Sequence, residues 1–182
     1  MNADDNDITW SKIKENVIFR NDFVGLRNDR VQRPDGEPVD LIVLETRDFS
    51  STICVDENNR VVLVRQFRYP WMMASWETAS GLVDSGETPE ECAIRETEEE
   101  TGYIVKEIKF LIKYHPSGIG HGWCYLFFAR VKVGGTQSLD PNEFMRVDTF
   151  EPAQVEQLIR QGEIVHAPTL LGWYLLAQND EW

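Results

Sequence analysis

The sequence is poor in cysteine, in basic residues and in long apolar runs, and each shortage argues against a class of protein. Its three cysteines in 182 residues are far apart and odd in number, which argues against a disulfide framework and against a zinc cluster. No apolar run approaches the length of a membrane span, and the first residues lack the basic and then apolar layout of a signal peptide. We therefore expect a soluble, cytoplasmic protein without a membrane partner.

Positive charge is also scarce. Lysine and arginine number 18 against 31 aspartates and glutamates, which gives a formal net charge of −13. A nucleic-acid backbone requires a basic surface, so no nucleic-acid partner is expected. A small phosphorylated substrate remains open, because cations and a few well-placed arginines can neutralise its phosphates locally.

The pattern of residues predicts a mixed α/β chain in which strands outnumber helices. Residues up to about 15 should be frayed or held by a neighbour, and residues 16–33 and 40–46 should form a small antiparallel N-terminal sheet. Residues 71–80 are predicted to be a loop, and His166 is expected to be structural. Further strands are predicted at 51–55, from 60 to Pro70, 105–114, 122–133 and 147–150, and helices at 152–161 and 167–178.

The densest charge lies between Gly81 and Tyr103, where eight acids stand beside one base, Arg95. Within this segment Thr88 begins the sequence TPEE, which combines a capping residue, a proline at the first helical position and a capping-box glutamate. Gly102 is a suitable C-terminal stop. A helix is therefore predicted from about 89 to 101.

Three carboxylates of this helix, Glu96, Glu99 and Glu100, are spaced i, i+3 and i+4 and so share one face. Like charges at this spacing destabilise a helix by about 0.2–0.5 kcal/mol per pair, and no lysine offsets them. Hard oxygen ligands on one face suit Mg²⁺ or Mn²⁺, which also bind phosphate oxygens. The residues alone leave two interpretations open, a divalent-metal site for phosphoryl chemistry and a solvated acidic helix.

The same segment resembles the Nudix signature, G-x5-E-x7-R-E-U-x-E-E-x-G-U, in which U is an apolar residue. Thr97, where the family prefers an aliphatic residue, is the one departure. The resemblance implies an αβα sandwich with a mixed central sheet, with a Nudix domain over 48–182 and a β-rich dimerisation element over 1–47. The matching residues are Gly81, Glu87, Arg95, Glu96, Glu99, Glu100, Gly102 and Tyr103.

The resemblance also implies roles in catalysis. Glu96 and Glu100 would be the main metal ligands, with Glu99 bridging or sharing a second ion and the Ser80 main-chain carbonyl completing the site. Arg95 would orient the glutamates. Several Mg²⁺ ions, for which Mn²⁺ could substitute, would polarise a pyrophosphate and lower the pKa of the attacking water.

The stretch VRQFRYP, followed by WETASG, is similar to the ADP-ribose and nucleotide-sugar pyrophosphatase branch of the family. By this similarity Arg68 would bind the substrate phosphate and Glu77 would contact the substrate. Thr78 and Ser80 replace the proline and alanine that are usual in this branch.

The N-terminal strands also resemble that branch, in which they form a dimerisation element and the partner chain helps to cover the nucleotide base. A homodimer with exchanged or shared N-terminal strands is therefore expected. Phe23 and Arg27 lie in the part that would reach across, where an aromatic ring can stack on the base.

The loop HPSGIGHG departs from the branch, many members of which have a glutamate just after the glycine as base or metal ligand. Ser117 and Gly118 are candidates for substrate binding here. His121 is a candidate catalytic base, because imidazole titrates near neutral pH. The alternatives for that role are Glu99 and Glu143, the latter from its own loop.

The resemblance as a whole favours a Mg²⁺-dependent nucleoside diphosphate sugar hydrolase. It would cleave ADP-ribose to AMP and ribose 5-phosphate, or GDP-mannose to GMP and mannose 1-phosphate, by in-line attack of water on one phosphorus. Two alternatives stay open. One is hydrolysis of another diphosphate, such as a dinucleotide cofactor or a dinucleoside polyphosphate, and the other is a Nudix-fold nucleotide-binding module without turnover.

Overall fold

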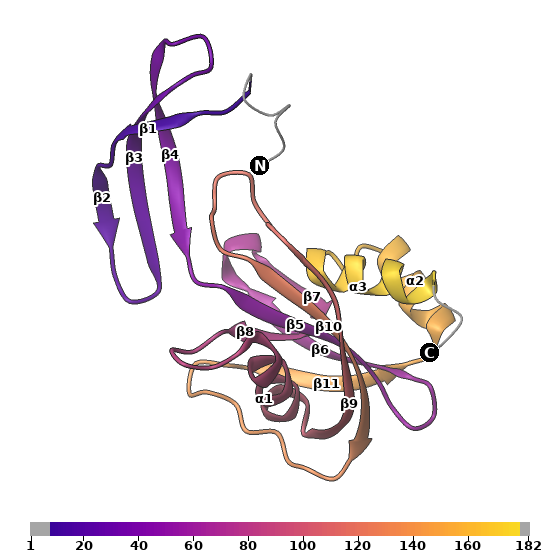
Figure 1. Ribbon diagram of the computed structural model, residues 1–182. Helices are drawn as coiled ribbons and strands as arrows, with labels where there is room; N and C mark the ends of the chain where they lie inside the picture. Colours follow the sequence, from indigo (N-terminus) through magenta and orange to yellow (C-terminus); the bar gives the residue numbers. More distant parts are fainter. Residues whose placement is uncertain (1–7, 179–182) are drawn as a thin grey trace. The chain divides into compact units, whose positions relative to one another are not determined.

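A computed structural model describes residues 8–178 and divides them into two units (Figure 1). The first unit holds residues 8–47 together with 115–123, and the second holds residues 48–114 together with 124–178. Over residues 8–178, the chain forms no helix that is both long and apolar enough to cross a membrane.

The first unit is a four-stranded antiparallel sheet. Its strand β3 (Val24–Gln32) pairs with β4 (Pro38–Thr46) along one edge and with β1 (Ser11–Lys14) and β2 (Val17–Arg20) along the other. The predicted small N-terminal sheet is thus confirmed. Of the two alternatives for the residues up to about 15, frayed or held by a neighbour, β1 follows the second, because it pairs with β3; residues 1–7 lie outside the described part. All side chains of β1 are exposed, so no alternation of apolar and polar residues marks this strand.

The second unit is a mixed sheet between two helical layers. The strand order is β11-β6-β5-β10-β9, with β7 paired to β6 and β8 to β5; β5 and β10 are parallel and the other pairs antiparallel. Helix α1 lies on one face, and α2 and α3 lie on the other (Figure 1). The strands are β5 (Phe49–Val55), β6 (Val61–Arg68), β7 (Met73–Glu77), β8 (Ala79–Leu82), β9 (Tyr103–Tyr114), β10 (Cys124–Val133) and β11 (Met145–Phe150), and the helices are α1 (Pro89–Thr101), α2 (Pro152–Arg160) and α3 (Ala167–Ala177).

Strand β5 shows how the sheet separates two cores, because successive side chains of a strand point to opposite faces. Ile53 and Val55 pack with Trp173 of α3 in one cluster. Cys54, between them, contacts Thr97 of α1, with Sγ and Oγ1 3.8 Å apart. The Thr97 hydroxyl donates a 2.7 Å hydrogen bond to the main-chain carbonyl one turn earlier, so the polar residue at this apolar position of the signature is buried without an unmet donor.

The prediction of a loop over 71–80 is wrong. The strand expected to reach Pro70 ends at Arg68, a 3₁₀ turn (Tyr69–Trp71) reverses the chain, and β7 then pairs back along β6. Met72 takes the left-handed conformation in this turn, with φ of 53°. Glycine and asparagine are the residues that normally mark such a position, so a methionine there gives no hairpin signal in the sequence.

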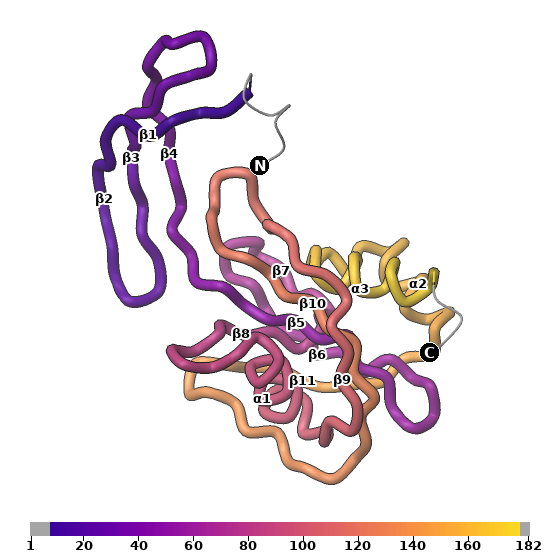
Figure 2. The backbone as a smooth tube through the Cα atoms, in the orientation of Figure 1, coloured from indigo at the N-terminus to yellow at the C-terminus, as the bar shows by residue number. Residues whose placement is uncertain are grey.

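The sheet opens beside this hairpin. Strands β5 and β6 pair only at Cys54 with Val62 and at Val55 with Val61. Beyond these pairs β6 continues with β7, and β5 continues with β8. Thr78 is the single residue between β7 and β8, so the chain passes from one edge of the opening to the other at this point (Figure 2). The opening places β6, β8 and the start of α3 around one pocket.

Candidate active site

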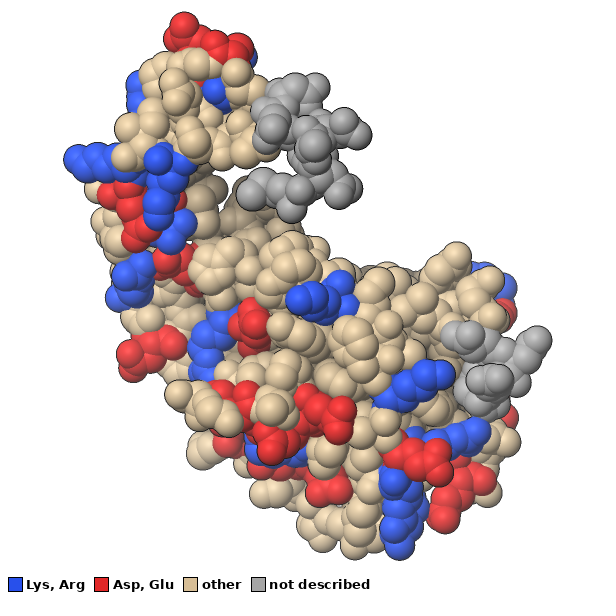
Figure 3. Space-filling view, viewed as in Figure 1, with Lys and Arg blue, Asp and Glu red and all other residues tan. Residues whose placement is uncertain are grey.

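Helix α1 begins and ends as its sequence predicts. The Thr88 hydroxyl accepts a hydrogen bond from the Glu91 N–H, the Glu91 carboxylate accepts one from the Thr88 N–H, and Gly102 closes the helix with φ of 71°. Acidic side chains gather over α1 and β8, with basic groups among them (Figure 3). The cap fixes the register of the helix, and that register decides which glutamates face the sheet.

Gly81 of β8 brings the chain against Glu96. A Cβ at Gly81 would lie 2.5 Å from Oε2 of Glu96 and closer still to its Cδ and Oε1. Real Cβ atoms essentially never come within 3.0 Å of another atom, so only glycine leaves room for this carboxylate where it lies. The first glycine of the signature therefore has a packing role that the structure makes explicit.

Arg95 links the loop before α1 to the helix. Its Nε and Nη2 donate to Glu87 at 2.8 and 3.0 Å, and its Nη1 donates to Glu96 at 2.6 Å and to Glu99 at 3.0 Å. The hydrogen bond from Arg95, more than any other cause, lowers the pKa of Glu87 to about 2. The arginine thus holds both the loop and two of the three candidate ligands.

Glu100 has different surroundings, because it is only 2% exposed and has no ion-pair partner among the described residues. Its carboxylate accepts a 3.0 Å hydrogen bond from the Ser80 N–H. Burial raises the pKa of Glu100 well above its usual value, and the charges of Glu96 and Glu143 raise it further. Burial is also the first cause of the raised pKa of Glu96, to which Glu99 and Glu143 add.

From the sequence, Glu143 is predicted only as an alternative to His121 for the role of catalytic base. It lies between β10 and β11, and its carboxylate accepts a 3.0 Å hydrogen bond from the Asp140 N–H. Its charge acts on both Glu96 and Glu100, so it belongs to the same cluster of carboxylates. No motif marks this position, and the sequence signal is only an acid in a loop that follows a long strand.

The donors of this cluster suit a divalent cation. They are carboxylate oxygens, which hard cations such as Mg²⁺ and Mn²⁺ prefer, and the buried carboxylate of Glu100 is in no ion pair in the described part of the chain, although the charge of Arg68 acts on it. Over residues 8–178 no three His, Cys, Asp or Glu side chains converge as a finished metal site, and Glu96 and Glu99 are bound to Arg95 instead. The helix face holds the predicted ligands, in an arrangement set by the arginine.

The two residues predicted to bind substrate in this unit form a pair. Arg68 donates to Glu77 through Nη2 at 2.6 Å and through Nε at 3.1 Å. Glu77 is fully buried, which raises its pKa, while the hydrogen bond and charge of Arg68 act in the opposite direction. The Arg68 side chain is 34% exposed, so the pair fixes a guanidinium whose outer edge is free to meet a ligand.

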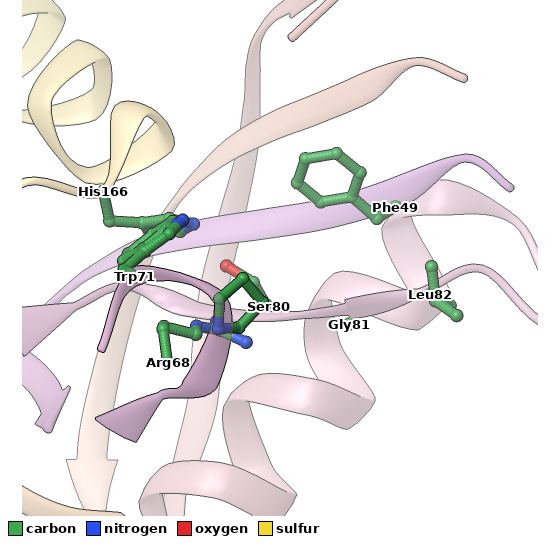
Figure 4. Close-up of a pocket in the computed structure, with 8 residues that line it drawn as sticks. Phe49, Arg68, Trp71, Ser80, Gly81, Leu82 and His166 are labelled. Carbon is green, nitrogen blue, oxygen red and sulfur yellow. The ribbon is translucent and has the colours of Figure 1, made fainter. Parts of the chain in front are cut away.

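A pocket of about 420 Å³ opens beside Arg68. Trp71, His166, Arg68 and Ser80 lie together along it, and Phe49 and Leu82 lie further along (Figure 4). No residue pattern around His166 indicates a pocket, because His166 reaches it only through the return of α3 to the opening between β5 and β6. The residues that line the pocket are Phe49, Arg68, Pro70, Trp71, Ser80, Gly81, Leu82 and His166.

Two of the remaining predicted residues belong to the N-terminal part of the first unit, Phe23 in the turn before β3 and Arg27 in β3 itself. Phe23 is 68% exposed at the turn before β3. Arg27 is bound within its own sheet, by ion pairs of 2.9 Å to Asp29 and 2.7 Å to Glu45.

The other three lie in the loop of the first unit. His121 donates its main-chain N–H to the Leu44 carbonyl at 3.2 Å, and the Ser117 hydroxyl accepts from the Ile119 N–H at 3.2 Å. At Gly118 a Cβ would meet nothing within 4 Å. The loop is held to β4 by two main-chain hydrogen bonds, from His121 to Leu44 and from Leu44 to Ile119.

The fold and the carboxylate helix together define an α/β enzyme of the class that hydrolyses phosphorus anhydrides. The family model described as "NUDIX domain" matches residues 47–171. The chain therefore belongs to the Nudix family, whose hydrolases in general require a divalent metal, usually Mg²⁺. This confirms the resemblance that the signature indicated.

Curated relatives carry several activities in their names. The chain is 28% identical over 162 residues to the "Methanol dehydrogenase activator" of Bacillus methanolicus, which covers 87% of this chain and 88% of the relative. It is 26% identical over 160 residues to the "ADP-ribose pyrophosphatase" of Bacillus subtilis, with 86% of each covered. It is 32% identical over 185 residues to the "GDP-mannose pyrophosphatase" of Salmonella typhimurium, with 90% and 92% covered.

A solved structure shares the fold. The "Crystal structure of ADP compounds hydrolase" matches with a TM-score of 0.80 at 16% identity, covering 93% of each chain. The predicted fold class, an αβα sandwich with a mixed central sheet and a small antiparallel sheet, is confirmed.

Proposed function

We propose that this protein hydrolyses the pyrophosphate of a nucleoside diphosphate sugar, ADP-ribose or GDP-mannose or both, to a nucleoside monophosphate and a sugar phosphate. The observation that carries the proposal is that the pocket beside Arg68 and the cluster of carboxylates have two residues in common. Ser80 and Gly81 line the pocket next to Arg68, and the same residues contact Glu100 and Glu96. A diphosphate held by the arginine thus lies next to the carboxylates. The names of two relatives, an ADP-ribose pyrophosphatase and a GDP-mannose pyrophosphatase, support this substrate class.

Glu96, Glu99 and Glu100, with the Ser80 main-chain carbonyl, would hold the Mg²⁺ ions, for which Mn²⁺ can substitute. Bound cations of this kind polarise a phosphoryl oxygen and lower the pKa of a bound water. Arg95 keeps Glu96 and Glu99 in position through its ion pairs. Holding ligands in place before the substrate arrives avoids reorganisation during the reaction.

Arg68 positions the substrate. Its Nε and Nη2 are directed at Glu77, which fixes the plane of the guanidinium and leaves its other N–H groups to bind a phosphate. The water oxygen forms a bond to one phosphorus while the bridging P–O bond breaks and its electrons go to the leaving phosphate. The proton of the water passes to a general base.

We infer that Glu143 is the base. Glu99 already accepts a hydrogen bond from Arg95 at 3.0 Å, whereas the charge of Glu143 acts on both Glu96 and Glu100. His121 is the alternative base. We expect Glu143→Gln to lower kcat by about 10²-fold or more and His121→Ala to change it little. The opposite result would assign the role to the histidine.

The substrate class is tested with purified protein, Mg²⁺ and a panel of ADP-ribose, GDP-mannose, UDP-glucose, NAD and diadenosine polyphosphates, with products identified by chromatography. Preference for a dinucleotide or dinucleoside polyphosphate would replace the sugar-nucleotide assignment. Binding without turnover of any compound would indicate a nucleotide-binding module. Glu100→Gln is the matched inactive control, because the amide keeps an acceptor for the Ser80 N–H and removes the charge.

We also propose that the N-terminal unit, residues 1–47, mediates a homodimer. Its strands β1 and β2 and the turn after them expose large apolar side chains, a feature of interaction surfaces. Light scattering should then give twice the 21.1 kDa mass of the chain, and Phe19→Glu should shift the mass to the monomer. A monomeric wild-type protein would contradict the proposal. The exposed apolar residues are Trp10, Ile13, Val17, Ile18, Phe19 and Phe23.

A further inference from the structure

The pocket beside Arg68 contains a histidine whose ring is bonded on one side only. His166 precedes α3, and its Nδ1 lies 2.9 Å from Oγ1 of Thr169. Nε2 has no hydrogen-bond partner among the described residues, and it is not one of the fully buried side-chain atoms that lack a partner. The ring lines the pocket, so Nε2 is the nitrogen that remains for a ligand.

The imidazole of His166 is neutral. Burial is the main cause that lowers its pKa, to about 3, and the positive charge of Arg68 contributes. Nδ1 of His166 lies 3.8 Å from Oε2 of Glu77, which is too far for a hydrogen bond. The Glu77 carboxylate is already bound to Arg68. A neutral imidazole has one donor and one acceptor nitrogen, and the partner of one nitrogen decides the role of the other.

A chain of hydroxyl groups joins His166 to Ser80 through the interior of the unit. Oγ of Ser80 lies 2.7 Å from Oγ of Ser51, which lies 2.7 Å from Oγ1 of Thr78. The chain continues over 3.2 Å to Oγ1 of Thr169 and then to His166. Ser51, Thr78 and Thr169 are buried, so solvent does not interrupt the chain.

Each hydroxyl has one proton to donate, and the direction at Ser80 sets the order of the whole chain. Ser80 donates to Ser51, so Ser51 donates to Thr78, Thr78 donates to Thr169 and Thr169 donates to Nδ1 of His166. Nδ1 is then the acceptor nitrogen and Nε2 carries the proton. The hydroxyl chain therefore makes His166 offer a hydrogen-bond donor to the pocket.

We propose that His166 is a specificity-determining residue that binds a hydroxyl group of the substrate's sugar through Nε2, while Trp71 packs against the sugar ring. This inference rests on the proposed function and names the part of the substrate that the pocket takes. The oxygen of a sugar hydroxyl accepts hydrogen bonds, which matches the N–H that Nε2 presents.

The shape of the pocket favours a sugar over a nucleobase. The rings of Trp71 and His166 are inclined at 42° with centroids 6.3 Å apart, whereas a planar base stacks best on parallel faces. Trp71 is 44% exposed, so one ring face is available to the apolar C–H surface of a sugar. Arg68 lies in the same wall and can bind the phosphate that carries the sugar.

The kinetic test uses His166→Asn. Asparagine is a favourable residue before a helix, and its short side chain keeps a polar group near Thr169 but has no counterpart of Nε2. We expect KM for the preferred sugar nucleotide to rise about 3- to 10-fold, the effect of one hydrogen bond, with kcat nearly unchanged. KM for the β-methyl ester of the same nucleoside diphosphate, which lacks the sugar, should not change. An equal rise for both substrates would overturn the proposal.

A second test does not depend on turnover. The chain has three histidines, so ¹⁵N spectra of the imidazole groups are simple, and His166→Asn assigns the signal of His166. Ribose 5-phosphate or mannose 1-phosphate should shift the Nε2 resonance of the wild type. Thr169→Val, which removes the hydroxyl beside Nδ1, should weaken the preference for the tautomer that carries its proton on Nε2. A shift with AMP but with neither sugar phosphate, or no shift with any of the three, would overturn the proposal.

The two tests separate this inference from the proposed function. If no nucleotide on the panel is cleaved but the sugar phosphates shift the His166 signal, the hydrolase assignment fails and the sugar site stands. If a sugar nucleotide is cleaved while the His166 signal and its KM stay unchanged, only the inference about His166 fails.

Discussion

Replacing Gly81 with alanine should separate stability from catalysis. The backbone of Gly81 is outside the left-handed region, so alanine itself is acceptable there. Its Cβ would lie 2.5 Å from Oε2 of Glu96 and closer to Cδ and Oε1. The overlap is with the end of a flexible side chain, so Glu96 has to turn away and the sheet does not have to move.

The expected magnitudes differ between the two properties. Forcing a side chain off its preferred rotamer costs about 0.5–1.5 kcal/mol, and removing a glycine from a strand gains about 0.5–1 kcal/mol. These two effects nearly cancel, so Tm should change by no more than about 4 °C. A displacement of about 1 Å at a catalytic group costs about 10²-fold in rate, so kcat should fall about 10²-fold.

The assay is a double-mutant cycle with Glu96→Ala, read by thermal unfolding and by release of nucleoside monophosphate. In the Glu96→Ala background the overlap is absent, so Gly81→Ala should raise the stability by about 0.5–1 kcal/mol and cause no further loss of activity. Two results would refute the reasoning. One is wild-type kcat in the Gly81→Ala variant, and the other is an equal loss of stability in both backgrounds, which would place the clash in the backbone.

Three further predictions concern the carboxylate helix. Thr88→Ala should cost about 0.5–2 kcal/mol in the free energy of unfolding, while Thr88→Ser keeps the cap and should cost little; equal losses would mean that the hydroxyl does not cap the helix. The pKa of Glu87 is lowered to about 2 by Arg95, so its stabilising effect is present above about pH 4.5 and is lost as the pH falls towards 2. Glu87→Gln should therefore flatten the acid side of the stability curve, and an unchanged curve would contradict the ion pair. EDTA should abolish turnover and Mg²⁺ restore it, and Mg²⁺ should raise Tm of the wild type more than that of Glu100→Gln; equal shifts would remove Glu100 from the metal site.

Prediction from sequence succeeded where a local interaction determines the structure. The cap at Thr88 and the stop at Gly102 require only neighbouring residues, so the bounds of α1 could be deduced. The hairpin at Met72 could not, because a left-handed methionine is held there by strand pairing and not by its own preference. Strand β7 was missed for this reason.

The residues of the candidate site also fall into two groups, those that can be predicted from the local sequence and those that only the fold brings to the site. Arg95 and its glutamates lie within one short segment, and their spacing is readable. His166 and Glu143 reach the pocket and the carboxylates from elements far along the chain, so only the fold reveals them. Glu77 is an intermediate case, since a similarity in sequence pointed to it, but its complete burial behind Arg68 could not be anticipated.

The electrostatic cost of the carboxylate helix is greatest at Glu100, although burial raises the pKa of Glu96 as well. The like-charged pairs Glu96–Glu99 and Glu96–Glu100 together cost at most about 1 kcal/mol as helix neighbours, and the cap at Thr88 alone offsets about that amount. Glu96 and Glu99 are further compensated by Arg95. Glu100 has no such partner in the described part of the chain, and burial disfavours its charged form. A cation that binds this carboxylate therefore relieves an existing penalty, so the folded site favours metal binding.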